Sequence, residues 1–498
     1  MSSSIKSKKK RCPNGTRKNK KTGNCEKKTN VINKEKRCPN GTRRNKKTGN
    51  CEKNKNKKFQ SVIHISSKNR SAGKKIQKFM FRTTNKRRVN FLKTVCSDSG
   101  VCIAFGQETQ KIQDFFGGFN KFKYVTGIKK IGKASKNGYI LEIQYSKENY
   151  NAHSILKNAL EKDSDNLAYE FFVGQYINKK INRFPCFLET YGLFIRKPHV
   201  QQIIDLQNDL SLLSNANQTK TNEDIYKISC EESKSLSLLI QHISNAQTLG
   251  DKLHYPDFII NDLLYVLYQI YMPLMCLQNE FTHYDLHTNN VLMYEPEIGK
   301  YIQYHYFVND TKISFKSKYI AKIIDYGRCF FYDTDINSSK YIHNKICQEN
   351  KCNPECGADY GYGWLHDDGL NGSDYYINSS ELNISHDLRL MYDITLHKKR
   401  NPSFALPQFP ALKNLLYKVQ YGIGIDNPKN KEYGTMPNPD SGIPDDINNI
   451  QDAYIMLEAL VKTSTIQKQN NNVYKSMTKL GDLYVYSSDK PIRFVPKK

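Results

Sequence analysis

The sequence predicts a mixed α+β fold for the greater part of its 498 residues. Segments with the two-residue alternation of β-strands come first along the chain, and segments with helical periodicity come later, an order typical of this class. Charge supports a division of the chain, because the basic residues gather at the N-terminus and leave a neutral remainder. With 38% hydrophobic and 11% aromatic residues, the chain can bury a core.

The first clear strand and helix are predicted beyond residue 120. Residues 139–145 have the alternating pattern of a strand with one buried face. A helix is predicted next, because four apolar or small residues recur at intervals of four, three and three and share one face. These residues are Leu167, Phe171, Gly174 and Ile177.

The later segments are more apolar. A short apolar run at 236–243 precedes the strongest helical pattern of the chain, at 257–279. Its apolar residues are 259, 260, 263, 264, 267, 270, 271, 274 and 275. Residues 291–294 and 319–324 then have the length and composition of short buried strands.

The positive charge belongs to the N-terminal segment. Residues 1–95 contain 32 Lys and Arg against three Glu, a balance of +29, whereas the other 403 residues balance to −1. Such a segment neutralises phosphates, so non-specific contact with nucleic acid or another polyanion is expected through residues 1–95. A solvated tail without a specific partner is the alternative. Residues 1–58 contain no aromatic side chain on which a base could stack.

The tail contains a sequence repeat. Residues 11–26 recur at 37–52 with a single change, Lys18 to Arg44. Each copy carries two cysteines thirteen residues apart and turn signals at Pro-Asn-Gly and Thr-Gly. Because apolar residues are few, each copy is at most a small pinned loop in an otherwise disordered tail. Zinc binding by the four cysteines is a weaker alternative, since the repeats lack a Cys-x-x-Cys pair.

Neither membrane insertion nor secretion is predicted. The most apolar stretch, 258–281, is interrupted by Asp262, Pro273 and several amides, and the N-terminus lacks an apolar signal segment. Thirteen cysteines is an odd number for a disulfide framework. A reducing compartment inside the cell is therefore expected.

The sharpest functional motif follows the helix predicted at 257–279. Residues 283–290 read His-Tyr-Asp-Leu-His-Thr-Asn-Asn, so that Asp285 precedes Asn290 by five residues. A carboxylate in such a loop can orient an attacking hydroxyl, while the amide oxygen holds a metal ion beside it. Downstream, Asp325 ends a predicted strand in the sequence Asp-Tyr-Gly and suits a Mg²⁺ ion that bridges phosphate oxygens. Both patterns indicate phosphoryl transfer.

These motifs, in this order, resemble the protein-kinase superfamily. The first is similar to the family's catalytic loop, and Asp-Tyr-Gly is similar to its metal-binding triplet. The resemblance implies Asp285 as the catalytic base, Asn290 and Asp325 as ligands of Mg²⁺ or Mn²⁺, and ATP as the phosphate donor. It also implies a bilobal fold, with a β-rich N-lobe that contains one helix and a mainly helical C-lobe.

Looser matches to the family lie upstream. Lys157 resembles the strand lysine that binds the α- and β-phosphates, and Glu170 resembles its helical partner. An ordinary surface lysine and glutamate are the alternative. Residues 131–140 resemble the glycine-rich loop over the phosphates, without its middle glycine and with the outer glycines one residue further apart. The matching positions are Ile131, Gly132, Ser135, Gly138 and Ile140.

Two further segments are similar to parts of the family. Residues 238–243 resemble the strand that enters the hinge between the lobes, where the backbone of Gln241, His242 and Ile243 would receive adenine. Asp387 resembles the aspartate that braces the catalytic-loop backbone, and a helix cap is its alternative.

The stretch between Asp325 and Asp387 departs from the family, because it contains no Ala-Pro-Glu sequence. It carries four potential zinc ligands at loose spacings, for which unliganded side chains are favoured. These are His343, Cys347, Cys352 and Cys356.

Within the superfamily the chain is most similar to divergent kinases encoded by large (giant) DNA viruses. These share the His-x-Asp-Leu-His-x-x-Asn loop, the Asp-Tyr-Gly triplet, a segment like residues 182–192 and lysine-rich tails with the sequence Arg-Cys-Pro-Asn-Gly-Thr-Arg. The resemblance covers roughly residues 120–460. It implies a serine/threonine kinase located in the host cytoplasm or the virion.

Other departures bear on regulation and substrate. Tyr284 replaces the arginine that would read a phosphorylated activation loop, and His287 replaces a lysine near the γ-phosphate. The Asp-Leu-His form also resembles kinases of choline and aminoglycosides. Thirty-four residues separate Asn290 from Asp325, which predicts an insertion near 295–317.

The sequence thus predicts four segments: a repeat-containing tail at 1–58, a basic linker at 59–119, an N-lobe at 120–245 and a C-lobe at 246–498. The expected activity is ATP- and Mg²⁺-dependent phosphorylation of Ser or Thr in a protein, without a membrane partner. A small-molecule kinase is one alternative. An inactive kinase-like virion protein that binds nucleic acid through its tail is another.

Overall fold

The computed structural model divides the chain into two units, Met1–Arg70 and Ser71–Lys498. The residues that it describes are 16–18, 25–27, 42–44, 51–53, 105–106, 108–135, 138–148, 150–159, 167–195, 217–218, 222–229, 236–243, 245–336, 338–346, 362–366, 373–377, 379–400, 405–421 and 443–497.

In the first unit, each copy of the repeat forms a two-stranded antiparallel ladder. β1 (Thr16–Lys18) pairs with β2 (Cys25–Lys27), and β3 (Thr42–Arg44) pairs with β4 (Cys51–Lys53). The two registers agree because the two sequences agree. Cys25 is disulfide-bonded, whereas the odd cysteine count led us to expect reduced thiols.

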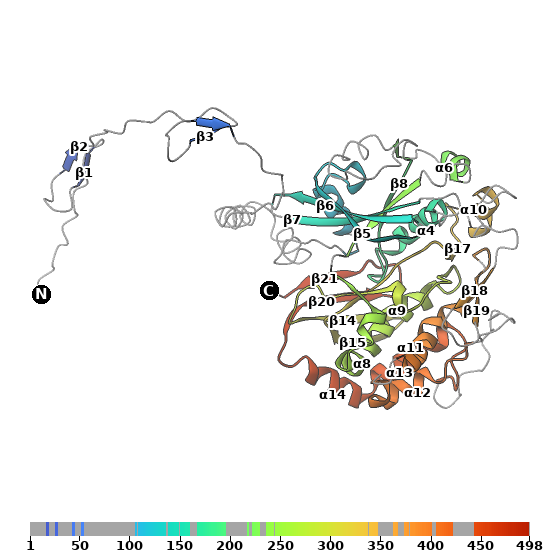
Figure 1. The fold of residues 1–498 in the computed structure, drawn as a ribbon. Coiled ribbons are helices and arrows are strands. Elements are labelled where there is room, and N and C mark those ends of the chain that lie inside the picture. Colours follow the sequence, from blue (N-terminus) through green and yellow to red (C-terminus); the bar gives the residue numbers. More distant parts are fainter. Residues whose placement is uncertain are drawn as a thin grey trace, which may run out of the picture. The chain divides into compact units, whose positions relative to one another are not determined.

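The N-terminal half of the second unit is built on a six-stranded sheet with the order β5-β6-β7-β10-β8-β9. Its neighbouring strands are antiparallel, and α4 packs against β8 and β10 (Figure 1). The elements are β5 (Val125–Ser135), β6 (Gly138–Lys147), β7 (Tyr150–Asn158), α4 (Leu167–Lys180), β8 (Thr190–Ile195), β9 (Asn217–Gln218), α6 (Asn222–Ser229) and β10 (Leu236–Gln241). The strand, the helix and the apolar run predicted from the sequence are β6, α4 and β10.

The C-terminal half is mainly helical, with α9 at its centre. Thirteen of the 15 residues of α9 are buried, and the helix packs against α13. The helices are α7 (Leu249–Lys252), α8 (Pro256–Asn261), α9 (Leu263–Leu277), α10 (Ser339–Ile346), α11 (Arg389–Arg400), α12 (Pro410–Leu416), α13 (Ile450–Lys462) and α14 (Ser464–Val473), with short 3-10 turns η4 (Thr288–Asn290), η6 (His386–Leu388) and η7 (Leu406–Gln408).

The single helix predicted at 257–279 is in fact two helices, α8 and α9. The break falls at Asp262, whose φ of −121° lies outside the helical range. Its buried carboxylate accepts a hydrogen bond from the Tyr474 hydroxyl, and burial raises the pKa of Asp262 to about 6. This contact joins residues 212 positions apart, so local periodicity could not reveal it.

Short strands complete this half. They are β11 (Gln247–Thr248), β12 (Phe281–Thr282), β13 (Val291–Tyr294), β16 (Ile320–Ile323), β17 (Phe330–Phe331), β18 (Tyr362–His366) and β19 (Ser373–Ile377). β13 and β16 confirm the strands predicted at 291–294 and 319–324. The predicted insertion is a hairpin that belongs to a four-stranded sheet, β15-β14-β20-β21. Its strands are β14 (Lys300–Val308), β15 (Thr311–Ser317), β20 (Thr478–Tyr486) and β21 (Arg493–Pro496).

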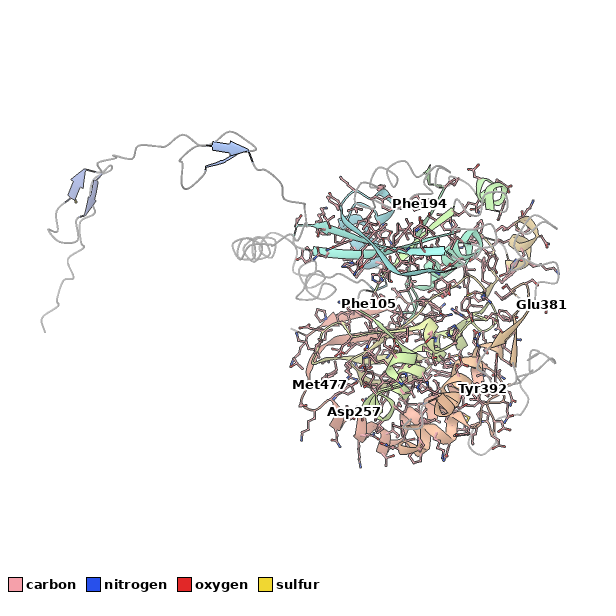
Figure 2. All side chains as sticks on the ribbon, in the orientation of Figure 1. Phe105, Phe194, Asp257, Glu381, Tyr392 and Met477 are labelled. Atoms are coloured by element: carbon pink, nitrogen blue, oxygen red, sulfur yellow. The ribbon has the colours of Figure 1, made fainter. Side chains whose placement is uncertain are left out.

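The folded body begins before residue 120. Within the segment interpreted as a linker, α3 (Glu108–Phe115) and the 3-10 turn η1 (Phe119–Lys121) are formed, and Phe105, Phe116 and Phe119 are buried. Phe105 lies where the two halves of this unit meet, with its ring 6.0 Å from that of Phe494 (Figure 2). The sequence did not reveal this contribution to the core, because the aromatic residues of the segment are scattered among many basic ones.

The α+β class predicted from the sequence is confirmed, with strand-rich and helix-rich halves in the predicted order. Among the residues that the structure describes, none of the helices is long and apolar enough to cross a membrane.

Candidate active site

The 283–290 motif forms a tight loop between β12 and β13. Tyr284 adopts a φ of +63°, which is rare for a bulky residue and marks a strained backbone. The strain is held by Asp387, whose two carboxylate oxygens accept hydrogen bonds from the backbone N–H groups of His283 at 2.7 Å and Tyr284 at 3.0 Å. These bonds confirm that Asp387 braces the loop, the role that the resemblance of its segment implied.

Asp387 is buried with its bonds. Burial raises the pKa of its carboxyl to about 7, although the two N–H donors and the charge of Arg389 act in the opposite direction. The Asp387 carboxyl therefore changes its charge near neutral pH.

Tyr284 anchors the loop to a second segment. Its side chain is buried, its hydroxyl donates to the carbonyl oxygen of Glu381 at 2.8 Å, and its ring lies 4.7 Å from that of His386. Tyr284 therefore provides an uncharged link between the loop and residues 381–386.

Asp285 lies among two arginines and a histidine. Its Oδ1 accepts a hydrogen bond from Arg389 at 2.8 Å and lies 3.7 Å from His287 Nε2, and its Oδ2 lies 3.8 Å from Arg328 Nε. Asn290 Nδ2 donates to the main-chain oxygen of Asp285 at 2.9 Å and to Oδ2 at 3.3 Å. These contacts fix the direction of the carboxylate.

Sequence analysis missed the two arginines. Arg389 follows Asp387 by two residues, and Arg328 follows Asp325 by three. An arginine within three residues of each motif aspartate was the feature of the sequence that could have indicated them. Only the fold shows that both side chains turn toward Asp285.

Asn290 and Asp325 lie at the adjacent ends of paired strands. β13 and β16 pair with Val291 opposite Ile323, and the N–H of Ile324 donates to the carbonyl oxygen of Asn290 at 3.0 Å. Because Asn290 uses Nδ2 as a donor toward Asp285, its Oδ1 is the atom suited to a cation.

Lys157 connects the two halves of the site. Its Nζ donates to Glu170 Oε1 at 2.7 Å and to Asp325 Oδ1 at 2.9 Å. Burial alone would lower the pKa of Lys157, but the charges of Asp325 and Glu170 outweigh it and raise the pKa. In turn Lys157 holds the pKa of Asp325 below its ordinary value. With Glu170 only 3% exposed, the alternative of an ordinary surface pair is wrong.

The residue after Asp325 stabilises this turn. Tyr326 is buried, and its hydroxyl accepts from the N–H of Leu188 at 2.8 Å and donates to the carbonyl oxygen of Ile323 at 3.0 Å. The hydroxyl therefore links the turn to the loop that follows α4.

The predicted glycine-rich segment is the hairpin of β5 and β6. Ile131 pairs with Ile140 and Ser135 pairs with Gly138, while Ile140 also lies opposite Lys157 of β7. Opposite residues of neighbouring strands point to one face, so Ile140 and Lys157 share a surface of the sheet.

The two glycines of this hairpin are required for different reasons. Gly132 has a φ of +65° with open space around its Cβ position. Gly138 has a φ of +145°, and a Cβ there would lie 2.0 Å from the carbonyl oxygen of Asn158.

The segment predicted to receive adenine is engaged within the protein. The N–H of Gln241 donates to the carbonyl oxygen of Glu189 at 2.8 Å, and the N–H of His242 donates to that of His153 at 3.3 Å. These two donors are therefore not available to a base. The carbonyl oxygen of Ile243 accepts from Ala246 at 3.4 Å.

The donor set fits one cation type better than others. Asn290 and Asp325 offer oxygen atoms only, which suits Mg²⁺ held by few protein ligands and completed by phosphates and water. Across the described ranges, no three His, Cys, Asp or Glu side chains are placed to hold a metal ion together. The ring of His343 stacks on Tyr169 at 4.3 Å, and Cys347, Cys352 and Cys356 lie outside the described residues.

Comparison with known proteins adds no assignment. No protein-family model matches the chain, and no curated protein matches it.

Proposed function

We propose that the chain is an ATP- and Mg²⁺-dependent phosphotransferase with a bilobal, protein-kinase-like fold, which phosphorylates Ser or Thr of a protein substrate. The observation that carries the proposal is the position of Lys157 between Glu170 and Asp325, at 2.7 and 2.9 Å. These three residues come from β7, α4 and the turn after β16. The cluster also lies near the Asp285 loop, and a purely structural ion pair would not require that neighbour.

The cationic and oxygen ligands account for phosphate binding. Lys157 supplies a positive charge for phosphate oxygens. At Gly132, where the surrounding space is open, the hairpin backbone carries no side chain that would prevent its close approach to a phosphate. Asn290 Oδ1 and the Asp325 carboxylate would hold Mg²⁺. When bound, the ion neutralises the charge that develops on the phosphates.

Asp285 would act on the acceptor. The substrate hydroxyl oxygen forms a bond to the γ-phosphorus, the bond from that phosphorus to the β–γ bridging oxygen breaks, and ADP leaves. Asp285 orients the hydroxyl and receives its proton. Arg389 and Asn290 hold the carboxylate for this role at 2.8 and 3.3 Å. Positioning and charge neutralisation are then the main contributions.

The test is phosphate transfer by the purified full-length chain. We expect transfer from ATP with Mg²⁺ to a generic basic protein or to the chain itself, and about 10²- to 10⁴-fold less by Asp285→Asn. Asp325→Ala should lose activity and weaken the Mg²⁺ dependence. Asp257→Asn, an exposed aspartate at the start of α8, is the matched control and should keep full activity.

Three outcomes would contradict parts of this proposal. Transfer to choline or an aminoglycoside instead of protein would establish the small-molecule kinase. Full activity in Asp285→Asn and Asp325→Ala would refute the roles assigned to these two carboxylates. A chain that binds no nucleotide would favour an inactive kinase-like protein. Location in a virion or host cytoplasm is part of the proposal only through the resemblance to viral kinases.

A further inference from the structure

The four-stranded sheet β15-β14-β20-β21 has two distinct faces. On the inner face, Tyr306 and Phe315 pack against Tyr268 of α9 at ring distances of 5.0 and 5.7 Å. Tyr304 of the same face is fully buried. The alternation of buried and half-buried residues along β14 and β20 leaves the other face toward solvent.

Large aromatic rings occupy that outer face, where an antiparallel or mixed sheet with one solvated side ordinarily carries polar residues. Each is partly exposed. We call them the aromatic face: Tyr301, His305, Phe307, Tyr484 and Tyr486.

The rings form an ordered column across β14 and β20. These strands are parallel, with His305 opposite Tyr484 and Phe307 opposite Tyr486. The opposite rings lie 4.8 Å apart at 22° and 5.2 Å apart at 16°, and Phe307 lies 6.4 Å from Tyr484 at 19°. Nearly parallel ring planes give a column that a flat aromatic ligand can extend.

Cations surround the column. The four strands contain five Lys and Arg residues against one carboxylate, Asp482. Lys312 lies opposite Phe307 in the sheet with its Nζ 5.7 Å from that ring, and Arg493 lies opposite Tyr484. Such a surface attracts a polyanion.

Asp482 is the single carboxylate among the strand residues, and it limits which class of ligand fits this surface. Lys479 and His305 both bond to its Oδ1, at 2.7 and 2.9 Å. A carboxylate has further acceptor capacity at its second oxygen. Beside a phosphate it is repulsive, but beside a ribose it can accept a hydrogen bond from the 2′-hydroxyl.

We propose that the aromatic face binds single-stranded RNA. Its bases would stack on the ring column, its phosphates would lie against Lys312, Lys316 and Arg493, and a 2′-hydroxyl would donate to Asp482. A duplex is a poor ligand because its bases already stack on one another. This site supplies the base-stacking side chains that residues 1–58 lack, and it is independent of phosphotransfer.

The test separates base stacking from charge. Full-length protein is titrated with a fluorescent oligouridylate and with an abasic oligomer of equal length, at about 0.15 M salt, where surface charges are screened beyond about 8 Å. We expect the oligouridylate to bind more tightly, and Phe307→Ala with Tyr486→Ala to weaken it about tenfold or more without affecting the abasic oligomer. Tyr255→Ala with Tyr417→Ala, two exposed tyrosines elsewhere, should change neither.

Two further variants leave the rings in place. Lys312→Glu with Arg493→Glu should weaken both oligomers and reduce the salt dependence of binding. Asp482→Asn should reduce the preference for RNA over DNA of the same sequence. Phosphotransfer is expected to be unchanged in each variant, so a failure here leaves the proposed activity intact.

The proposal is overturned if the double aromatic variant binds oligouridylate as the unsubstituted chain does, or if the unsubstituted chain binds the abasic oligomer equally well. Equal affinity for DNA would refute the choice of RNA. Should the aromatic variant lose its folded structure, photo-crosslinking of 5-iodouridine RNA to the unsubstituted chain decides. Crosslinks within 300–308 and 478–486 support the site, and their absence refutes it.

Discussion

The Lys157 cluster and the Asp285 cluster have opposite charge arrangements. In the first, one cation lies between two carboxylates, Glu170 and Asp325. In the second, one carboxylate lies among cations, with Arg389 at 2.8 Å and Arg328 at 3.8 Å. Each central charge is compensated by residues distant in the chain, and neither cluster exists without the fold.

The clusters differ in what they connect. Lys157 joins β7 and α4 of the strand-rich half to the turn after β16 of the helical half. The contacts of Asp285 lie between 285 and 389, within the helical half. The first cluster therefore depends on how the two halves sit together, while the second sets the direction of one carboxylate. Changes to the first should affect nucleotide binding and stability, and changes to the second should affect turnover alone.

The largest effect is expected for Lys157→Met. Glu170 would remain buried without the charge of Lys157, and breaking a buried ion pair destabilises a protein by about 3–5 kcal/mol. Denaturant unfolding should show this loss, and the KM for ATP should rise. Lys157→Met with Glu170→Gln should recover part of the stability but not the activity. Lys468→Met, on the exposed side of α14, should behave as the unsubstituted chain. If Lys157→Met were as stable as the unsubstituted chain, the Lys157 cluster would not contribute to stability as we expect.

A smaller effect is expected for Arg389→Lys. Lysine lacks the planar fork that orients a carboxylate, so kcat should fall about tenfold, or ~1.4 kcal/mol, with an unchanged KM for ATP. Arg183→Lys is the matched control, because Arg183 also contacts an aspartate, Asp489 at 3.0 Å, away from the site. Steady-state kinetics decide, and a change confined to KM would show that the Asp285 cluster also serves nucleotide binding.

The third prediction concerns stability in acid. Burial lowers the pKa of His283 and His343 to about 4. Between pH 6.5 and 4 the unfolded chain binds these protons and the folded chain does not, so these two groups lower the stability of the fold as pH falls. Asp262 and Asp387, with raised pKa values, act in the opposite sense.

The contribution of one histidine is isolated by comparing variants. His343→Gln should have a shallower fall of unfolding free energy below pH 6.5 than the unsubstituted chain, as measured by denaturant titration at several pH values. His254→Gln, an exposed position, should keep the original slope. Parallel pH curves for His343→Gln and the unsubstituted chain would contradict the burial argument.

The sequence predicted what is local or ordered along the chain. The loop at 283–290 was recognisable because its residues are contiguous, and Lys157 and Glu170 were placed by their order and by the helical face around Glu170. Arg389 and Arg328 were missed because their contact with Asp285 exists only in three dimensions. The backbone of Gln241, His242 and Ile243 was expected to receive adenine, although the N–H groups of Gln241 and His242 donate to the carbonyl oxygens of Glu189 and His153.

Long-range pairing explains the other gaps. The hairpin at 300–317 was predicted only as an insertion, because β14 completes its sheet with β20, more than 170 residues away. The alternation of β14 is also ambiguous by itself, since tyrosine occurs on both faces. Nothing in the local pattern distinguishes Tyr306, which packs on α9, from Phe307 on the aromatic face.

The two glycines of the β5–β6 hairpin, Gly132 and Gly138, limit which substitutions this sequence can accept in evolution, and they do so for different reasons. At Gly138 a side chain of any kind would collide with the backbone of β7, so we expect glycine to persist in descendants of the chain whether or not they bind a nucleotide. At Gly132 the surrounding space is open, and only the positive φ resists replacement. In related sequences, a glycine at 138 will indicate that the contact between β6 and β7 is preserved. An asparagine or aspartate at 132 would be tolerated.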